Sequence, residues 1–213
     1  DVLVAPLPVS ANIYSYEAIF HGTSSHVCLA NSTDNAIYMA CDAVSKIGAL
    51  PYSETETINA VSMIHGGVRN NIISDSCSIA GSIRSFDKNE HENIKKTVWN
   101  ILRESARLYN GDVEINTSID LMATEINNQL YNIFYKSINA LYPQQPCKEI
   151  KKRELIGEDF ARFADKVPGM YFMLHTKPEG TSFPLHHPKF DVNENVLHKG
   201  SIIFSGFALM WQD

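Results

Sequence analysis

Residues 78–108 read SIAGSIRSFDKNEHENIKKTVWNILRESARL and join a predicted strand to the clearest predicted helix of the chain. Asp87 and Glu90 form the D-x-x-E pattern that caps a helix N-terminus. The stretch after this cap repeats at three- and four-residue steps, which is typical of an amphipathic helix. One stripe of that helix holds Ile94, Val98, Ile101, Leu102, Ser105 and Leu108.

Further strands and one helix surround this segment. Strands are predicted over 13–20, 57–64, 72–86 and 113–121, where β-branched and aromatic residues concentrate. Asp34 is predicted to cap a second helix, which Gly48 ends. The order β-α-β-β-α-β predicts a ferredoxin-like, split βαβ domain over residues 11–122.

The remainder of the chain is less periodic. A helix is predicted over 127–141, a short helix opens near Gly157, and a helix begins near Glu194. This half has few strands, so we expect it to complete a sheet supplied by other residues. The predicted fold class is therefore α+β with a mixed α/β part. Its organisation is residues 1–10 as a linker, 11–122 as one domain and 123–213 as part of a second.

Composition excludes several classes of protein. The 213 residues include 18 Lys and Arg against 24 Asp and Glu, for a net charge of −6. No basic cluster suggests a nucleic-acid partner, no apolar run is long enough to span a membrane, and no signal peptide is visible. These absences predict a cytoplasmic protein. The four cysteines lack a CxxC spacing and are predicted to be buried, reduced thiols.

Arg84 is a candidate binding residue because of its neighbours on the strand. Alternation places Ser78, Ala80 and Ser82 on the same face as Arg84. Small residues around one guanidinium leave room for a planar anion, and a carboxylate is the natural guest. Asn71 could add an amide donor. A solvated strand arginine paired with an acid is the competing interpretation.

Three histidines are candidates for chemistry. His186 and His187 lie in a Pro-rich loop, and neutral imidazole is a common ligand for transition metals. His26 follows a Gly-Thr-Ser-Ser turn that could present its ring to a cleft. From spacing alone, ordinary surface or loop histidines are the favoured interpretation of all three. No HExxH or similar motif supplies further metal ligands for His186 and His187.

Four segments in order resemble one family, the metal-dependent amidohydrolases and exopeptidases that include aminoacylases, glutamate carboxypeptidase, hippurate hydrolase and plant indole-acetyl-amino-acid hydrolases. His21–His26 with Asp34–Ile37 resembles the family pattern G-K-x-x-H-A … D-N-A-I. Asn71–Asp75 with Gly81–Asp87 resembles N-V-I-P-D … G-x-x-R-x-F-D.

Two more segments of this resemblance lie in the second half. Gly157–Phe160 with Val167–Gly169 resembles A-E-D-F … V-P-G, and Leu185–Asp191 resembles L-H-x-P-x-F-D. The resemblance covers nearly the whole chain and is strongest for the hippurate and acyl-amino-acid branch. It implies a ferredoxin-like lid over 11–122, which makes a homodimer. It also implies that 123–213 is the C-terminal part of a zinc-exopeptidase-like catalytic domain.

The resemblance also implies roles for single residues. His186 would be a metal ligand. His26 would reach from the lid, of the same or of the partner subunit, to stabilise the tetrahedral oxyanion. Asn71 and Arg84 would hold the carboxylate of the amino-acid moiety. Glu158 and Asp159 would shape the loop beneath the metals. The reaction would be hydrolysis of an N-acyl amino acid by water activated on divalent metal, two Zn or Mn per complete subunit.

The resemblance is incomplete in a way that bears on activity. The family's H-A-C-G-H-D segment and Glu-Glu pair have no counterpart here, so they are expected upstream of position 1, and the chain alone is expected to be inactive. Leu3 stands where this branch places another His ligand, and the Pro that usually follows the lid histidine is absent. The alternative function is therefore a non-catalytic relative that serves as a binding or dimerisation module.

Overall fold

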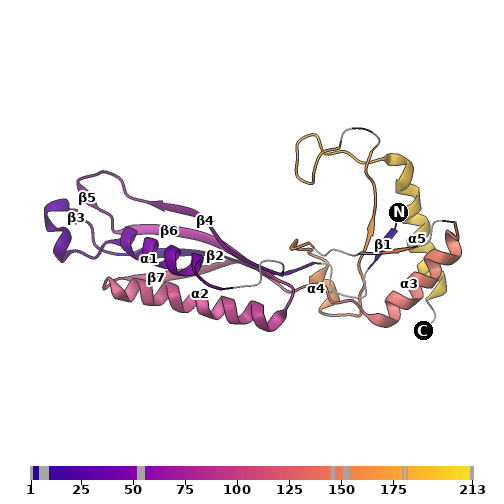
Figure 1. The fold of residues 1–213 in the computed structure, drawn as a ribbon, viewed down its shortest axis with the longest axis horizontal. Helices are drawn as coiled ribbons and strands as arrows, with labels where there is room; N and C mark the ends of the chain where they lie inside the picture. The colour runs from indigo at the N-terminus through magenta and orange to yellow at the C-terminus, as the bar shows by residue number, and fades with distance from the viewer. Residues whose placement is uncertain are drawn as a thin grey trace. The chain divides into compact units, whose positions relative to one another are not determined.

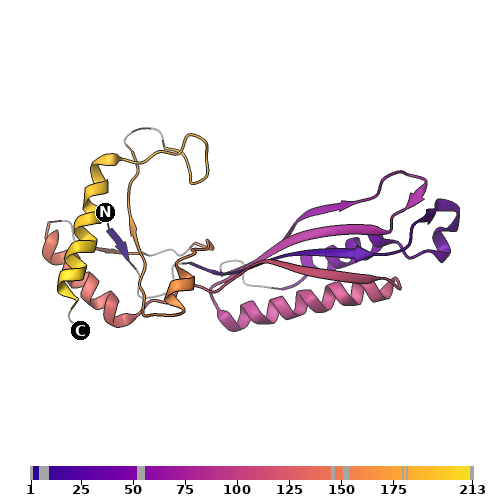
Figure 2. The ribbon, with the colours of Figure 1, turned by 180° about the vertical axis from the view of Figure 1, so that it is seen from behind.

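The structure is a computed structural model that describes residues 2–4, 10–51, 56–144, 147–150, 154–178, 180 and 182–211. It divides into two compact units. Unit 1 consists of Asp1–Val9, Thr124–Arg153 and Phe160–Asp213, and unit 2 of Ser10–Ala123 and Glu154–Asp159. Figures 1 and 2 show the elements of both units from opposite sides. Within the described ranges, no helix is both long and apolar enough to cross a membrane.

Unit 2 contains a four-stranded sheet covered on one face by two helices. The strands are β2 (Asn12–His21), β4 (Thr57–Gly66), β6 (Ser76–Ser85) and β7 (Asp112–Leu121), and the helices are α1 (Ala36–Gly48) and α2 (Lys88–Leu108). The spatial order is β4-β6-β2-β7, and every neighbouring pair is antiparallel. This confirms the predicted ferredoxin-like arrangement (Figure 1).

The core of unit 2 lies between the sheet and these helices. Tyr14 and Phe20 of β2 point into it with Ile83 of β6, and Met39 of α1 and Leu102 of α2 meet them. All five side chains are fully buried. Alternation along β6 buries every second residue, as predicted, and leaves the other face of the sheet half-buried.

The helix caps agree with the prediction in α2 and differ in α1. The carboxylate of Asp87 accepts a hydrogen bond of 2.7 Å from the backbone N–H of Glu90, which confirms the α2 cap. In α1 the cap is Asn35, whose side-chain oxygen accepts from the N–H of Ile37 at 3.0 Å. The prediction of Asp34 was wrong by one residue, because the helix begins at Ala36 and its N-cap position is therefore Asn35. The backbone carbonyl of Asp34 accepts from the N–H of Thr23 in the preceding loop.

The strand predicted over 72–86 is divided in two. β5 (Ile72–Ile73) pairs with β3 (Ser25–His26), and β6 begins only at Ser76. Between them, the hydroxyl of Ser74 donates to the carbonyl of Ser76 at 2.7 Å. Such a local side-chain bond competes with ladder pairing, so the chain turns here and β5 leaves the main sheet. A short 3-10 helix, η1 (Val27–Ser32), follows β3.

Unit 1 is built around a small sheet and two helices. Its elements are β1 (Val2–Val4), α3 (Asn128–Leu141), β8 (Lys148–Glu149), α4 (Ala161–Ala164), β9 (Phe172–Leu174), η2 (Glu194–Val196) and α5 (Leu197–Met210). The sheet order is β8-β1-β9, with β1 parallel to β8 and antiparallel to β9. Phe134, Ile138 and Ile203 form the centre of the core between α3 and α5. The helix predicted to open at Gly157 begins at Ala161 and has four residues.

His91 of α2 is an ionisable group within unit 2 that we expect to make stability depend on pH. Its side chain is fully buried, and neither ring nitrogen has a hydrogen-bond partner among the residues that the structure describes. Burial lowers the pKa of His91, an effect that Glu92 and Asp120 oppose and Lys95 reinforces. The His91 ring therefore binds a proton less tightly in the folded state than in the unfolded state. The free energy of unfolding falls as the pH drops below about 6.5, the pKa of histidine in the unfolded chain.

We expect the melting temperature to fall as the pH is lowered from 7.5 to 5.5. His91 should contribute up to about 1.4 kcal/mol per pH unit to the loss in free energy of unfolding. Thermal unfolding of the wild type and of His91→Met would measure it, since methionine is apolar and does not titrate. An equal pH slope in the two proteins would contradict the assignment.

Candidate functional site

His26 and Asn71 lie side by side at one end of unit 2. His26 of β3 pairs with Ile72 of β5, and the N–H of Val27 donates to the carbonyl of Asn71 at 3.0 Å. Both candidate residues are exposed. Figure 1 shows β3 and β5 beyond the end of the four-stranded sheet. The tertiary structure thus joins two residues that are far apart in sequence into one polar tip.

The surroundings of the His26 ring fix which nitrogen carries its proton. The backbone N–H of Cys28 donates to Nδ1 at 3.3 Å, and the Cys28 sulfur lies 3.2 Å from the same atom. Because Nδ1 accepts, the neutral ring carries its hydrogen on Nε2. The exposed Nε2–H is therefore available as a donor to a negatively charged group.

Arg84 lies on the half-buried face of β6, as its position in the alternation predicted. One guanidinium N–H donates to the backbone carbonyl of Leu155 at 2.8 Å. Among the described residues, no carboxylate pairs with Arg84. The arginine is thus anchored through one bond, and most of its donors remain available to a planar anion.

Arg84 is remote from the polar tip in a single copy of the chain. The strand from Ser76 to Arg84 spans eight steps, or about 26 Å at roughly 3.3 Å per residue. β5, which follows Asn71, lies on the far side of Ser76 (Figure 1). The expectation that Asn71 and Arg84 hold one carboxylate together is therefore not met within one copy.

The segment 154–159 covers the end of the sheet next to Arg84. Besides the Leu155 bond, the carbonyl of Ile156 accepts from the N–H of Ala11 at 2.8 Å. Gly157 lies so close to the sheet that a Cβ there would be 2.2 Å from Cδ1 of Ile13. Glu158, half-buried, and Asp159, exposed, follow on the same segment. The residue that holds the arginine is thus Leu155, three positions before the predicted loop residue Glu158.

His186 lies in an exposed turn of unit 1 and has an unusual backbone. Its φ of 66° is in the left-handed region, which costs free energy for a residue with a side chain. The neighbouring His187 is held differently, because its Nδ1 accepts from the N–H of Lys189 at 3.0 Å and its ring stacks on Phe183. Both histidines are exposed, and His187 is the one whose ring these local contacts hold.

The residues present do not by themselves form a metal centre. Over the parts of the chain that the structure describes, no group of three or more His, Cys, Asp or Glu side chains could hold a metal ion. A metal site needs several such ligands with the right geometry. His186 alone therefore does not fit one.

Comparison with known proteins relates most of unit 2 to a known family. The family model described as "Peptidase dimerisation domain", of the M20 peptidases, matches residues 10–110. Residues 10–110 are thus similar to the dimerisation domain of M20 peptidases. This match supports the family resemblance of the sequence motifs.

The relatives extend the similarity beyond the dimerisation domain. Thermostable carboxypeptidase 2 of Saccharolobus solfataricus is 27% identical over 217 residues, which cover 97% of this chain and 53% of the relative. An IAA-amino acid hydrolase of Arabidopsis thaliana (ILR1-like 2) is 26% identical over 206 residues. The aligned region covers 92% of this chain and 46% of that hydrolase. The chain thus spans about half the length of these relatives.

A solved structure supports the fold. The YXEP protein of Bacillus subtilis, a dinuclear metal-binding peptidase of the M20 family, has a TM-score of 0.76 at 20% identity. The match covers 98% of this chain and 52% of that one. At this identity the likeness establishes the fold.

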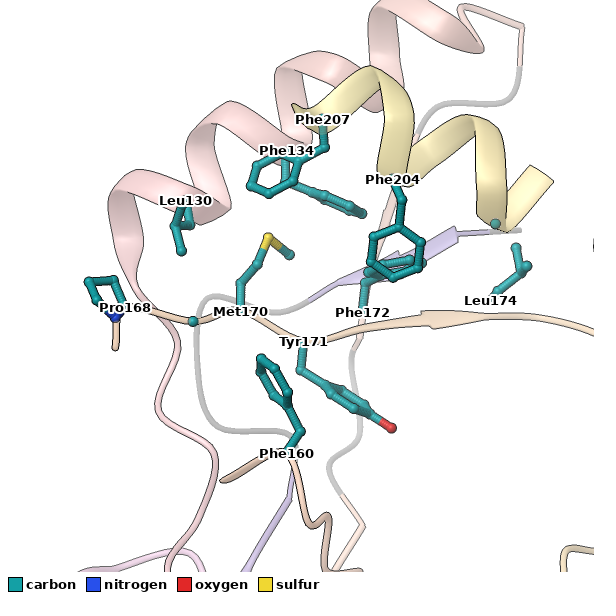
Figure 3. Close-up of a pocket in the computed structure, with 12 residues that line it drawn as sticks. Leu130, Phe134, Phe160, Pro168, Met170, Tyr171, Phe172, Leu174, Phe204 and Phe207 are labelled. Atoms are coloured by element: carbon teal, nitrogen blue, oxygen red, sulfur yellow. The ribbon is translucent and has the colours of Figure 1, made fainter. Parts of the chain in front are cut away.

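Unit 1 also contains an apolar cavity that the sequence did not reveal as a site. Its volume is about 550 Å³, and Figure 3 shows aromatic side chains from α3, β9 and α5 converging on it. Ring centroids of Phe134 and Phe172 are 4.8 Å apart, and those of Phe172 and Phe204 are 5.2 Å apart. None of the predicted site residues lines the cavity. The i, i+3 spacing of Phe204 and Phe207 was the available signal, but it predicts only an apolar helix face.

Proposed function

We propose that this chain carries the dimerisation domain and the C-terminal part of the catalytic domain of an amidohydrolase that acts on N-acyl amino acids. The activity belongs to the complete protein, and the chain alone is inactive. Arg84 is the observation that carries the proposal. It is a half-buried guanidinium with small neighbours, one anchoring bond and no acid partner among the described residues.

The carboxylate of the substrate would bind Arg84. A guanidinium and a carboxylate form two parallel N–H···O bonds, which orient the substrate as well as hold it. Leu155 takes one N–H and so fixes the plane of the group. Glu158 and Asp159 act indirectly, by shaping the segment that supplies this carbonyl.

His26 and Asn71 would reach the same substrate from a second copy of the chain. In an N-acyl amino acid, the carboxylate and the amide are separated by a single carbon, whereas His26 in β3 lies beyond the far end of the sheet that carries Arg84 in β6. A symmetric dimer resolves this, because each copy can lend its tip to the other. His26 would then donate from Nε2 to the oxyanion, and Asn71 would donate its amide to the carboxylate.

The edge strand β4 is suited to the contact between copies. It is at the edge of the sheet, where backbone groups are available for pairing. Met63 and Ile64 of this strand are 53% and 48% exposed. Burying these side chains against a second copy would stabilise the dimer.

The metal requirement is part of the proposal, with most ligands outside the described residues. The family implies divalent metal, which we propose to be two Zn or Mn ions per complete subunit, with His186 as one ligand. Metal of this kind supplies an activated water. The metal ligands among the described residues are too few to complete a metal site. The water that attacks the amide would therefore be activated by residues outside those described.

Arg84→Ala tests the proposal in the full-length protein assayed with N-acyl amino acids and Zn²⁺ or Mn²⁺. Loss of a charge-assisted pair is expected to lower kcat/KM about 10- to 150-fold, mainly through KM. Arg84→Lys should restore part of the loss, because it keeps the charge without the planar fork. Absence of hydrolysis in the wild type would refute the function, and an unchanged KM in Arg84→Ala would refute the role of the arginine.

A non-catalytic relative is the second candidate function. It is favoured by Leu3, which lies in β1 where the resemblance expects a histidine ligand. Metal analysis of the full-length protein separates the two, since stoichiometric bound metal contradicts this alternative.

A further inference from the structure

The apolar cavity of unit 1 is not explained by the proposed reaction. All its lining residues belong to unit 1, and none of them is charged. Phe204 of α5 points toward Phe172, with the ring centroids 5.2 Å apart (Figure 3), and is nevertheless 63% exposed. An exposed apolar surface of this kind marks a contact with another chain, a ligand or a further segment.

Helix α5 is apolar on more than the side that faces the cavity. Its 14 residues include no acid, and Lys199 is its only Lys or Arg. Ile202 and Leu209 are also exposed, and they share one flank of the helix because they are seven positions apart. Phe204 lies about 200° around the helix from Ile202, on the opposite flank. A helix that is apolar all round is typical of a buried position, so we expect both flanks of α5 to be covered.

The start of β1 lies next to the cavity. β1 is the central strand of the unit 1 sheet, and Val2 pairs with Leu174 of β9, which lines the cavity. Any residues that precede β1 in the complete protein therefore enter unit 1 beside the cavity. A segment joined at this point has a high effective concentration there, which favours it over a separate molecule as the occupant.

We propose that the cavity and both exposed flanks of α5 form a docking surface for the upstream part of the catalytic domain, whose apolar side chains fill the cavity. The inference rests on the proposed function, which places that part before position 1. The chain spans about half the length of its relatives, so a segment of sufficient size is available. A second copy of the chain and a small apolar ligand are the competing occupants.

Thiol labelling of the full-length protein tests this docking surface without any assay of hydrolysis. Cys28 and Cys41 are exposed, contrary to the prediction that all four cysteines are buried, so both are replaced by serine in every variant. Leu209→Cys and Phe204→Cys place one thiol on each flank of α5. Val68→Cys is the matched control, because Val68 of unit 2 is 81% exposed and Leu209 is 82% exposed.

In the full-length protein, N-ethylmaleimide should modify Leu209→Cys and Phe204→Cys at least about tenfold more slowly than Val68→Cys. The physical reason is that a covered thiol reacts only when the covering contact opens. In residues 1–213 produced alone, Leu209→Cys and Val68→Cys should react at similar rates. Equal rates at these two thiols in the full-length protein would overturn the proposal.

Two other results would identify a different occupant and would also overturn the proposal. Slow labelling of Leu209→Cys in residues 1–213 alone would show that a second copy covers the surface. Slow labelling of Phe204→Cys beside rapid labelling of Leu209→Cys in the full-length protein would indicate a small molecule in the cavity.

Activity is measured separately, so the two proposals fail in different ways. A full-length protein that protects both thiols and hydrolyses no N-acyl amino acid would refute the proposed function and leave the docking surface standing. Rapid labelling of both thiols in an active enzyme would refute the docking surface alone.

Discussion

His26→Ala is expected to lower kcat of the full-length protein about 10²- to 10³-fold, as does loss of one donor to an oxyanion. KM should change little, because the donor acts where charge develops in the transition state rather than on the bound amide. The structure supports this role through the acceptor state of Nδ1, which leaves Nε2–H exposed as the donor. Steady-state kinetics on an N-acyl amino acid would measure the two constants separately.

His21→Ala is the matched control for this substitution. His21 is also an exposed histidine of the dimerisation domain, at the end of β2, and its ring lies 4.0 Å from Glu114. It is not part of the polar tip, so kcat should stay near the wild-type value. A large loss in His21→Ala, or a wild-type kcat in His26→Ala, would contradict the assignment.

Mixing two impaired variants, assayed at a substrate concentration well below KM, tests whether the site is shared between copies. In a mixed dimer of His26→Ala and Arg84→Ala, one site combines the intact Arg84 of one copy with the intact His26 of the other. Random re-association should therefore recover about a quarter of wild-type activity, since half of the dimers are mixed and each has one intact site. Failure to recover activity, with dimers shown to exchange, would place both residues in the site of the same copy.

Leu102→Ala is expected to have the largest effect on stability, lowering the free energy of unfolding by about 2–5 kcal/mol. Leu102 is fully buried between α2 and the sheet, so the substitution loses buried apolar area and leaves a cavity in a close-packed core. Denaturant unfolding would show it as a lower midpoint with an unchanged slope.

Leu108→Ala provides the comparison on the same helix. Leu108 is 62% exposed, so its truncation should change stability by no more than about 0.5 kcal/mol. The sequence placed both leucines in one apolar stripe, and the two substitutions distinguish that stripe from the true core. Similar losses in the two variants would show that α2 packs differently from the structure described above.

Local patterns were sufficient to predict most of the dimerisation domain. Alternation identified the strands and the face of Arg84, because successive side chains of a strand point to opposite sides. The Asp87 cap was predictable because its hydrogen bond joins residues three apart. The choice of Asn35 over Asp34 was not, because it depends on the distant loop that uses the Asp34 carbonyl.

The sequence predicted which residues belong to the candidate site, but it did not predict how these residues lie relative to one another. The motifs identified Arg84, His26, Asn71 and His186 by type and order. They did not show that a strand of about 26 Å separates Arg84 from the tip, since that requires the length and direction of β6. They also missed Cys28, because its proximity to Nδ1 arises from the turn into η1.

The sequence by itself determined most of the secondary structure of residues 11–122, the ferredoxin-like order of its elements and the chemical types of the candidate residues, because periodicity and caps act over a few residues. Only the tertiary structure decided which of those residues are neighbours. Pairing of β3 with β5 joins His26 to Asn71, and the Leu155 carbonyl anchors Arg84 from 71 residues away. Contacts between residues so distant in the chain depend on the whole packing of the unit, and no local pattern encodes them.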